Sequence, residues 1–113
     1  AGQRWHEQAS IVHAIIFMVD VSDHERMEES KQCLGLVLRQ EKVSTAPIVV
    51  LGNKMDRPGS LTEEELVMAL NVEHLRTGKG SELPNGRPFE VFMCSLMSRK
   101  GHREALAWIA HVV

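Results

Sequence analysis

The fold of this chain is decided by one stretch of sequence, Pro47-Ile48-Val49-Val50-Leu51-Gly52-Asn53-Lys54-Met55-Asp56, in which an apolar run ends in a polar turn. Two further apolar runs, residues 14–20 and 89–94, also contain β-branched residues. Continuous apolar strands are typical of a parallel sheet that helices cover on both faces. Taken alone, each run is equally compatible with a buried helical segment.

Between these runs the apolar residues recur at helical spacing. A first helix is predicted over residues 23–40, with Ser22 and Asp23 as N-cap candidates. The capping-box pattern of residues 62–65 predicts a second helix, which ends near Leu70. Its three consecutive glutamates are expected to face solvent at the start of this helix, where the helix dipole favours them.

The C-terminal part of the chain completes the pattern. Residues 77–88 contain three glycines and two prolines, which predict a loop. A third helix after Arg99 is predicted to carry one apolar stripe, formed by Ala105, Leu106, Ile109, Val112 and Val113. Because strands and helices alternate, we expect an α/β fold with a three-stranded parallel sheet and flanking helices.

Composition excludes several classes of protein. The chain has 113 residues, 43% of them hydrophobic and 25% charged, which fits one globular domain and neither a disordered nor a membrane-spanning chain. Its 13 Lys and Arg against 15 Asp and Glu leave no basic excess, so nucleic acid is not an expected partner. The two cysteines, Cys33 and Cys94, are too few for a disulfide framework and favour a reducing compartment.

Candidate site residues follow the predicted strands, because ligands of open α/β sheets bind beyond the carboxyl ends of the strands. These positions hold Asp20, residues 53–56 and residues 94–96. The Asp56 carboxylate can accept both donors on one edge of guanine, N1 and the 2-amino group. Adenine lacks this pair of donors, so the mismatch costs roughly 1–3 kcal/mol. Asn53 can link neighbouring loops, and Lys54 can lay its aliphatic stem along a base while its ammonium stays solvated.

Four segments of the chain resemble a known family: Leu51-Gly-Asn-Lys-Met-Asp-Arg57, Thr62-Glu-Glu-Glu-Leu66, Thr77-Gly-Lys-Gly80 and Arg87-Pro-Phe-Glu-Val-Phe-Met-Cys-Ser95. They resemble the Sar branch of the Arf/Sar small GTPases, which starts COPII coat assembly at the endoplasmic reticulum. The resemblance runs from about Trp5 to Val113, and the Thr-Gly-Lys-Gly loop separates Sar-like from Arf-like chains. It implies a partial P-loop GTPase (Rossmann-like) fold. It also implies guanine-binding residues, which are Asn53, Lys54, Asp56, Cys94, Ser95 and Leu96.

Some motifs of that family are absent from these residues. The sequence contains no Gly-x-x-x-x-Gly-Lys-[Ser/Thr] loop for phosphate and Mg²⁺ and no threonine-bearing switch, and Ala1 to Trp5 match the segment after the catalytic residue. The resemblance therefore implies that residues 1–113 form a single partial domain. This would be the C-terminal, guanine-recognition half, lacking the P-loop, switch I and the start of switch II. GTP or GDP and the Mg²⁺ site belong to the full-length parent, so this chain alone is expected to bind no metal and to hydrolyse no GTP.

The resemblance also implies partners and a location. The parent would be cytoplasmic and peripheral to endoplasmic reticulum and Golgi membranes. It would bind COPII coat, exchange and activating proteins and touch the membrane through an N-terminal segment outside these residues. From the sequence itself we expect a homo-oligomer through the strand from Ala14 to Asp20, which has no Pro, Lys or Arg to prevent edge pairing.

Two alternatives stay open at this point. One is a GTPase-like interaction module without nucleotide function, and the other is an unrelated enzyme on a doubly wound sheet. The string Gly78-Lys79-Gly80 resembles a fragment of a phosphate loop, but a short surface string is weak evidence. Cys94 is expected to be a buried small hydrophobe rather than a reactive thiol. The six histidines show no metal-ligand spacing.

Overall fold

Three parallel strands form the sheet of the computed structural model, which describes residues 14–80, 82 and 86–113. Along the chain the elements are β1 (Ile15–Asp20), η1 (His24–Arg26), α2 (Met27–Leu38), η2 (Glu41–Val43), β2 (Ile48–Asn53), α3 (Glu63–Leu70), η3 (Glu73–Leu75), β3 (Phe89–Met93) and α4 (His102–Val112). The strand order is β1-β2-β3, with Ile15 beside Ile48 and Ile48 beside Phe89. The predicted α/β fold is confirmed.

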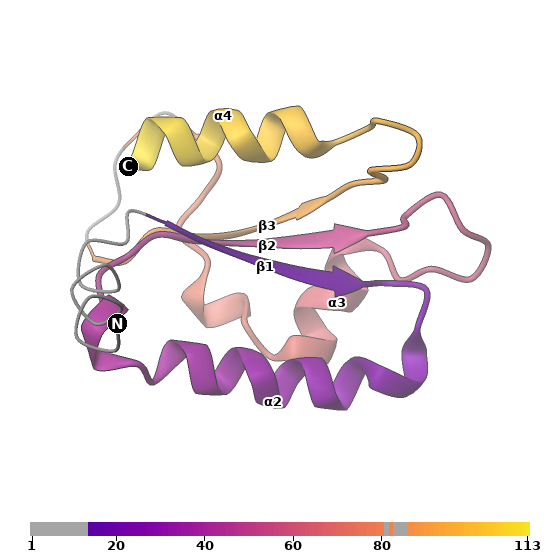
Figure 1. Cartoon of the computed structure of the whole chain (residues 1–113), viewed down its shortest axis with the longest axis horizontal. Helices are drawn as coiled ribbons and strands as arrows, with labels where there is room; N and C mark the ends of the chain where they lie inside the picture. Colours follow the sequence, from indigo (N-terminus) through magenta and orange to yellow (C-terminus); the bar gives the residue numbers. More distant parts are fainter. Residues whose placement is uncertain (1–13, 81, 83–85) are drawn as a thin grey trace, which may run out of the picture.

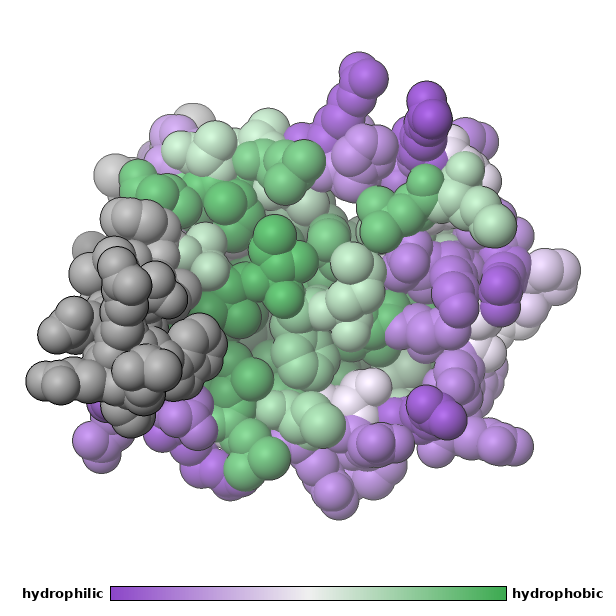
Figure 2. Space-filling model, in the orientation of Figure 1, coloured by the Kyte–Doolittle hydropathy of each residue, from purple (hydrophilic) through white to green (hydrophobic). Residues whose placement is uncertain are grey.

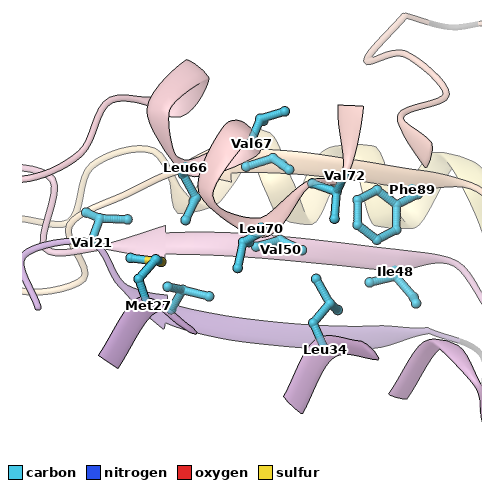
Figure 3. Packing of buried hydrophobic residues seen from close by; sticks show 12 residues of the cluster. Val21, Met27, Leu34, Ile48, Val50, Leu66, Val67, Leu70, Val72 and Phe89 are labelled. Atoms are coloured by element: carbon cyan, nitrogen blue, oxygen red, sulfur yellow. The ribbon is translucent and has the colours of Figure 1, made fainter. Parts of the chain in front are cut away.

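Helices cover both faces of the sheet, with α4 on one side and α2 and α3 on the other (Figure 1). The larger core cluster lies between the sheet and the pair α2 and α3, where Leu34, Leu66 and Leu70 pack against the strands (Figure 3). A smaller cluster joins the opposite face of β2 and β3 to Ala105 and Trp108 of α4. Residues 48–51 of β2 are all buried, which explains why this run is continuously apolar.

The start of the first helix differs from the sequence-based prediction. Residues 24–26 form a 3-10 turn, α2 begins at Met27, and the Asp23 side chain makes no capping hydrogen bond. Ser22 instead donates from its backbone and its hydroxyl to Asp20 Oδ1, at 2.9 and 2.6 Å. The prediction of Ser22 and Asp23 as N-caps was wrong because the carboxylate at the end of β1 organises this turn.

The start of α3 follows the prediction. Thr62 Oγ1 accepts from the Glu65 backbone at 3.2 Å, and Glu65 Oε1 accepts from the Thr62 backbone at 2.9 Å. This reciprocal pair satisfies two backbone donors that no helical carbonyl can reach. Because all partners lie within four residues, the sequence alone was sufficient to predict it.

The apolar stripe of α4 was partly mispredicted. Ala105 is buried as expected, but Leu106 is 52% exposed and Val113 is 60% exposed, whereas Trp108 is buried. The indole Nε1 of Trp108 donates to the Gly78 carbonyl at 3.1 Å. The large ring therefore sets the rotation of the helix and turns Leu106 away from the core.

The two edges of the sheet differ. At the β3 edge, Thr77 exchanges hydrogen bonds with the backbone of Phe89, and the buried Glu90 carboxylate accepts from the backbone of Val91 and Gly78 at 3.0 and 2.9 Å. Arg76 Nε lies 2.8 Å from Glu90 Oε1 and neutralises this buried charge. At the other edge, β1 pairs with β2 alone among the residues that the structure describes.

The expectation that Ala1 to Trp5 match the segment after the family's catalytic residue concerns positions outside the described residues. Within residues 14–80, 82 and 86–113, none of the helices has the length and apolar character that crossing a membrane requires.

Candidate functional site

A pocket of about 520 Å³ opens at the carboxyl ends of β2 and β3, where the loops that follow the two strands lie next to each other (Figure 1). It is lined by Asn53, Lys54, Asp56, Arg57, Ser95, Leu96 and Met97. The structure therefore brings five of the six predicted site residues into one pocket. The sixth, Cys94, is fully buried behind it, with its Sγ 3.8 Å from Asn53 Oδ1.

Asn53 links the two loops. Its Oδ1 accepts from the backbone amide of Lys54 at 2.8 Å and from that of Leu96 at 3.0 Å. A backbone hydrogen bond from Met55 to the Cys94 carbonyl, at 3.1 Å, joins the loops a second time. The predicted linking role of Asn53 is confirmed, and its oxygen is occupied by the protein itself.

Lys54 adopts an unusual backbone conformation, with φ at 68°. For a residue with a side chain, this left-handed region costs roughly 1–3 kcal/mol and is maintained by the surrounding contacts. One such contact is the hydroxyl of Ser60, which donates to the Lys54 carbonyl at 2.8 Å. The conformation directs the lysine side chain back over the end of the sheet, toward β1.

The ammonium of Lys54 ends beside Asp20, with Nζ 2.8 Å from Asp20 Oδ2. This hydrogen bond, followed by that of the Ser22 hydroxyl, lowers the pKa of Asp20 to about 2. The expectation of a fully solvated ammonium was therefore incomplete. The sequence placed each residue at the end of a predicted strand, since Asp20 ends β1 and Lys54 follows β2. Only the structure shows that these two strands are neighbours, so that the two side chains meet.

Asp56 is the exposed carboxylate of the pocket. A hydrogen bond from the Ser95 hydroxyl, and then its own backbone amide, lower the pKa of Asp56 below its ordinary value. The group is therefore ionised at neutral pH and acts only as an acceptor. Ser95, in turn, is buried, and its Oγ accepts from the Ser98 backbone at 3.2 Å.

The loop after β3 is closed by backbone hydrogen bonds. Ser95 and Lys100 exchange backbone hydrogen bonds at 2.9 and 3.0 Å, which closes residues 95–100 into a tight turn. The chain then passes Gly101 at φ 83°, where a Cβ would overlap the carbonyl oxygen of Met93. Only glycine fits this position, so the turn stays against the end of β3 and presents Leu96 and Met97 to the pocket.

This arrangement matches the chemistry of a planar base with two adjacent donors. Asp56 supplies an ionised acceptor, the stem of Lys54 supplies an apolar surface, and Leu96 supplies a second one. Arg57 and Met97 were missed by the sequence reasoning, and only their positions next to the predicted residues could have indicated them. No cluster of three metal-ligating side chains exists among the described residues.

The other sequence motifs are not part of this pocket. Lys79 of the Gly-Lys-Gly string lies 2.6 Å from Glu63 Oε1 and 4.4 Å from the centre of the Phe92 ring, so its ammonium is engaged by the protein. Glu63 also pairs with Arg76 at 3.0 Å. Burial raises the pKa of the Cys94 thiol, in agreement with its expected role as a small core residue.

Comparison with known proteins adds independent information. A model of the ADP-ribosylation factor family matches residues 2–113. The chain is 35% identical over 112 residues to the small COPII coat GTPase SAR1 of Giardia intestinalis, a match that covers 97% of this chain and 59% of the relative. It is 33% identical over 109 residues to ADP-ribosylation factor-like protein 1 of Drosophila melanogaster, a match that covers 96% of this chain and 56% of that relative. It is also 34% identical over 95 residues to the small COPII coat GTPase SAR1B of Dictyostelium discoideum, a match that covers 84% of this chain and 48% of that relative. The chain spans about half the length of the curated relatives it matches.

Proposed function

This chain belongs to the ADP-ribosylation factor family of small GTPases, and on that premise we propose that its pocket binds the guanine base of a guanine nucleotide. In this proposal the Asp56 carboxylate accepts from guanine N1 and the 2-amino group. The stem of Lys54 and the side chain of Leu96 lie against the base, and the loop at residues 95–97 lines the pocket beside it. Asn53 holds the loops after β2 and β3 together.

One observation carries this proposal. The ionised carboxylate of Asp56 and the loop at residues 95–97 line the same pocket, although they are separated by about 40 positions in sequence, and Asn53 links the two loops that carry them. A bidentate contact between a carboxylate and two donors is geometrically specific. Cys94 supports the site from behind as a packed core residue rather than as a ligand.

We further propose that these 113 residues are the base-recognition, C-terminal half of the domain. The sequence carries the Asn-Lys-x-Asp motif and no Gly-x-x-x-x-Gly-Lys-[Ser/Thr] loop. Phosphates and Mg²⁺ would then be held by residues other than these, and hydrolysis would require them. A base pocket alone, without a phosphate cradle, supports an affinity no better than roughly millimolar.

Within the family we propose the Sar branch, and hence a role in COPII vesicle budding between the endoplasmic reticulum and the Golgi. Two of the relatives are COPII coat GTPases by name, while another is an ADP-ribosylation factor-like protein. The Thr77-Gly78-Lys79-Gly80 loop that suggests the Sar branch is fixed to the fold through Trp108 and Glu63. Coat, exchange and activating proteins would be the partners, at the cytoplasmic surface of these membranes.

The base-binding proposal is tested by titrating the ¹⁵N-labelled chain with GMP and with AMP, which differ only in the base. We expect saturable shifts of the backbone amides of Leu96 and Met97 with GMP, at millimolar concentration, and no comparable response to AMP. Asp56→Ala should abolish the response to GMP. Glu64→Ala, which removes an exposed carboxylate on α3, should retain it.

Two results would contradict the proposal. Equal responses to GMP and AMP would show that the pocket does not read the base. The lack of any response at these amides in a folded chain would favour the alternative, an interaction module that keeps the fold without nucleotide function.

A further inference from the structure

The two walls of the pocket at the ends of β2 and β3 differ in chemistry. The wall formed by the loop after β2 is polar and charged, and it consists of Asn53, Lys54, Asp56 and Arg57. The wall formed by the loop after β3 carries two large apolar side chains, Leu96 and Met97. Figure 2 shows mostly hydrophilic surface at the end of the molecule toward which the strands of Figure 1 point, interrupted by an apolar patch. A ligand of this pocket therefore meets charge on one side and apolar surface on the other.

Leu96 and Met97 lie at different depths of the apolar wall. Leu96 is 44% exposed, whereas Met97 is 91% exposed, more than any other large apolar side chain that the structure describes. Leu96 therefore forms the inner part of the wall, and Met97 forms the rim at the mouth of the pocket. An apolar side chain left in water forgoes the stabilisation that burial supplies, and a ligand that covers it recovers part of that stabilisation.

Hydrogen bonds on both sides of Met97 keep its side chain at this rim. The amide of Leu96 donates to Asn53 Oδ1 at 3.0 Å, and the amide of Ser98 donates to Ser95 Oγ at 3.2 Å. Moving the Met97 side chain into the core would break these hydrogen bonds. Its exposure is therefore imposed by the fold of the loop that carries it.

We propose that Met97 covers the outer face of the bound base, an inference that rests on the proposed function. The Lys54 stem and Leu96 contact the base from within the pocket, and the thioether of Met97 packs on the face that is turned to solvent. Methionine suits this position, because its unbranched side chain adapts its shape and its sulfur makes favourable contacts with aromatic rings. Asp56 binds the edge of the base and Met97 its face, so Met97 contributes affinity without selecting guanine.

The first test observes the methyl group of Met97 directly. In a chain labelled with ¹³C at the methionine methyl groups, titration with GMP should move the Met97 signal upfield, because the group lies over the face of an aromatic ring. The signal that disappears in Met97→Leu identifies Met97. The signal of Met68, which is 80% exposed on α3, is the internal control and should not move.

The possible outcomes separate this inference from the proposed function. A shift of the Leu96 amide without a shift of the Met97 methyl group would show that the base binds and leaves Met97 uncovered, which overturns the inference alone. A downfield shift of the methyl group would also overturn it, because that shift places the group beside the ring edge. The lack of a response at both groups in a folded chain would overturn the inference and the proposed function together.

The second test compares GMP with IMP, which lacks the 2-amino group and so loses one of the two contacts proposed for Asp56. Met97→Gln retains the length of the side chain but makes it polar, and it should weaken the binding of both nucleotides by the same factor, roughly two- to tenfold. Met97→Leu retains an apolar side chain of similar volume and should stay within about twofold of the native affinity. Met68→Gln, on α3, is the matched control and should change neither affinity.

Two results of this comparison would overturn the inference. Native affinities in Met97→Gln would show that Met97 does not contact the base. A changed ratio of the GMP and IMP affinities in that variant would place Met97 at the edge of the base rather than on its face.

Discussion

Asn53 Oδ1 lies 3.0 Å from the backbone nitrogen of Leu96, a residue 43 positions further along the chain, and this hydrogen bond joins the loops after β2 and β3. The geometry of the pocket therefore depends on one side chain that need not touch a ligand. The same oxygen also fixes the backbone of Lys54. Removing it would disturb both walls of the pocket at once.

We expect Asn53→Ala to lower the free energy of unfolding by about 1–3 kcal/mol, because two backbone donors lose their acceptor. Hydrogen exchange at the amides of Lys54 and Leu96 should become faster. Asn53→Asp retains an acceptor oxygen and should keep these amides protected. Equal protection of both amides in the Ala variant would contradict the linking role.

Asp56→Asn should change which base is preferred. The substitution replaces one acceptor oxygen with a donor amide, which suits the carbonyl that xanthine carries where guanine has its 2-amino group. In titrations of the labelled chain, the response to GMP should weaken and that to XMP should strengthen. An unchanged preference for GMP would show that Asp56 does not contact the base edge.

The ion pair of Lys54 and Asp20 predicts that the stability of the fold decreases in acid. Because its partners lower the pKa of Asp20 from 3.8 to about 2, the folded state binds a proton less readily than the unfolded state. The stabilisation is complete above the unfolded pKa and is lost as the pH falls toward 2. Since both side chains are about one-third exposed or more, we expect about 1 kcal/mol or less at neutral pH.

This dependence is measured by urea unfolding of the native chain and of Asp20→Asn at several pH values. The difference in unfolding free energy between them should shrink between pH 3.8 and 2. Asp23→Asn is the matched control, because that carboxylate lies on the same turn beside the exposed Arg26. A constant difference between the native chain and Asp20→Asn across this range would refute the prediction.

Gly101→Ala should destabilise the fold by about 3 kcal/mol or more, because the added methyl group would overlap the Met93 carbonyl in a left-handed backbone. Gly59→Ala separates the two causes, since Gly59 has φ 80° but open space around it. It should cost only about 1–2 kcal/mol. Thermal unfolding of both variants checks the difference, and equal losses would show that backbone strain alone acts at Gly101.

The parts of the fold that sequence predicted are those decided by local chemistry. The capping box of Thr62 and Glu65 involves four consecutive residues, and the buried run of β2 is apolar because helices cover both faces. The predicted N-cap Asp23 makes no capping hydrogen bond and lies beside Arg26 instead, while the Asp20 carboxylate accepts from Ser22. Leu106 was misplaced because helical spacing does not reveal which of two adjacent apolar residues faces the core.

The candidate site shows the same limit. The motif at residues 53–56 and the segment at 94–96 were predicted because each follows a recognisable strand. The contact between Lys54 and Asp20 spans 34 positions and depends on which strands become neighbours. Arg57 and Met97 carry no sequence signal beyond their positions next to the predicted residues, and the assembled pocket shows that they line it.

Part of the β3 edge is already occupied by the chain itself. Thr77 hydrogen-bonds with the backbone of Phe89, and the Glu90 carboxylate accepts from the backbone of Val91. A strand added along this edge would have to displace Thr77 and the Glu90 carboxylate before it could pair with these backbone groups. Segments that cover a sheet edge in this way are one means by which folded proteins avoid edge-to-edge aggregation.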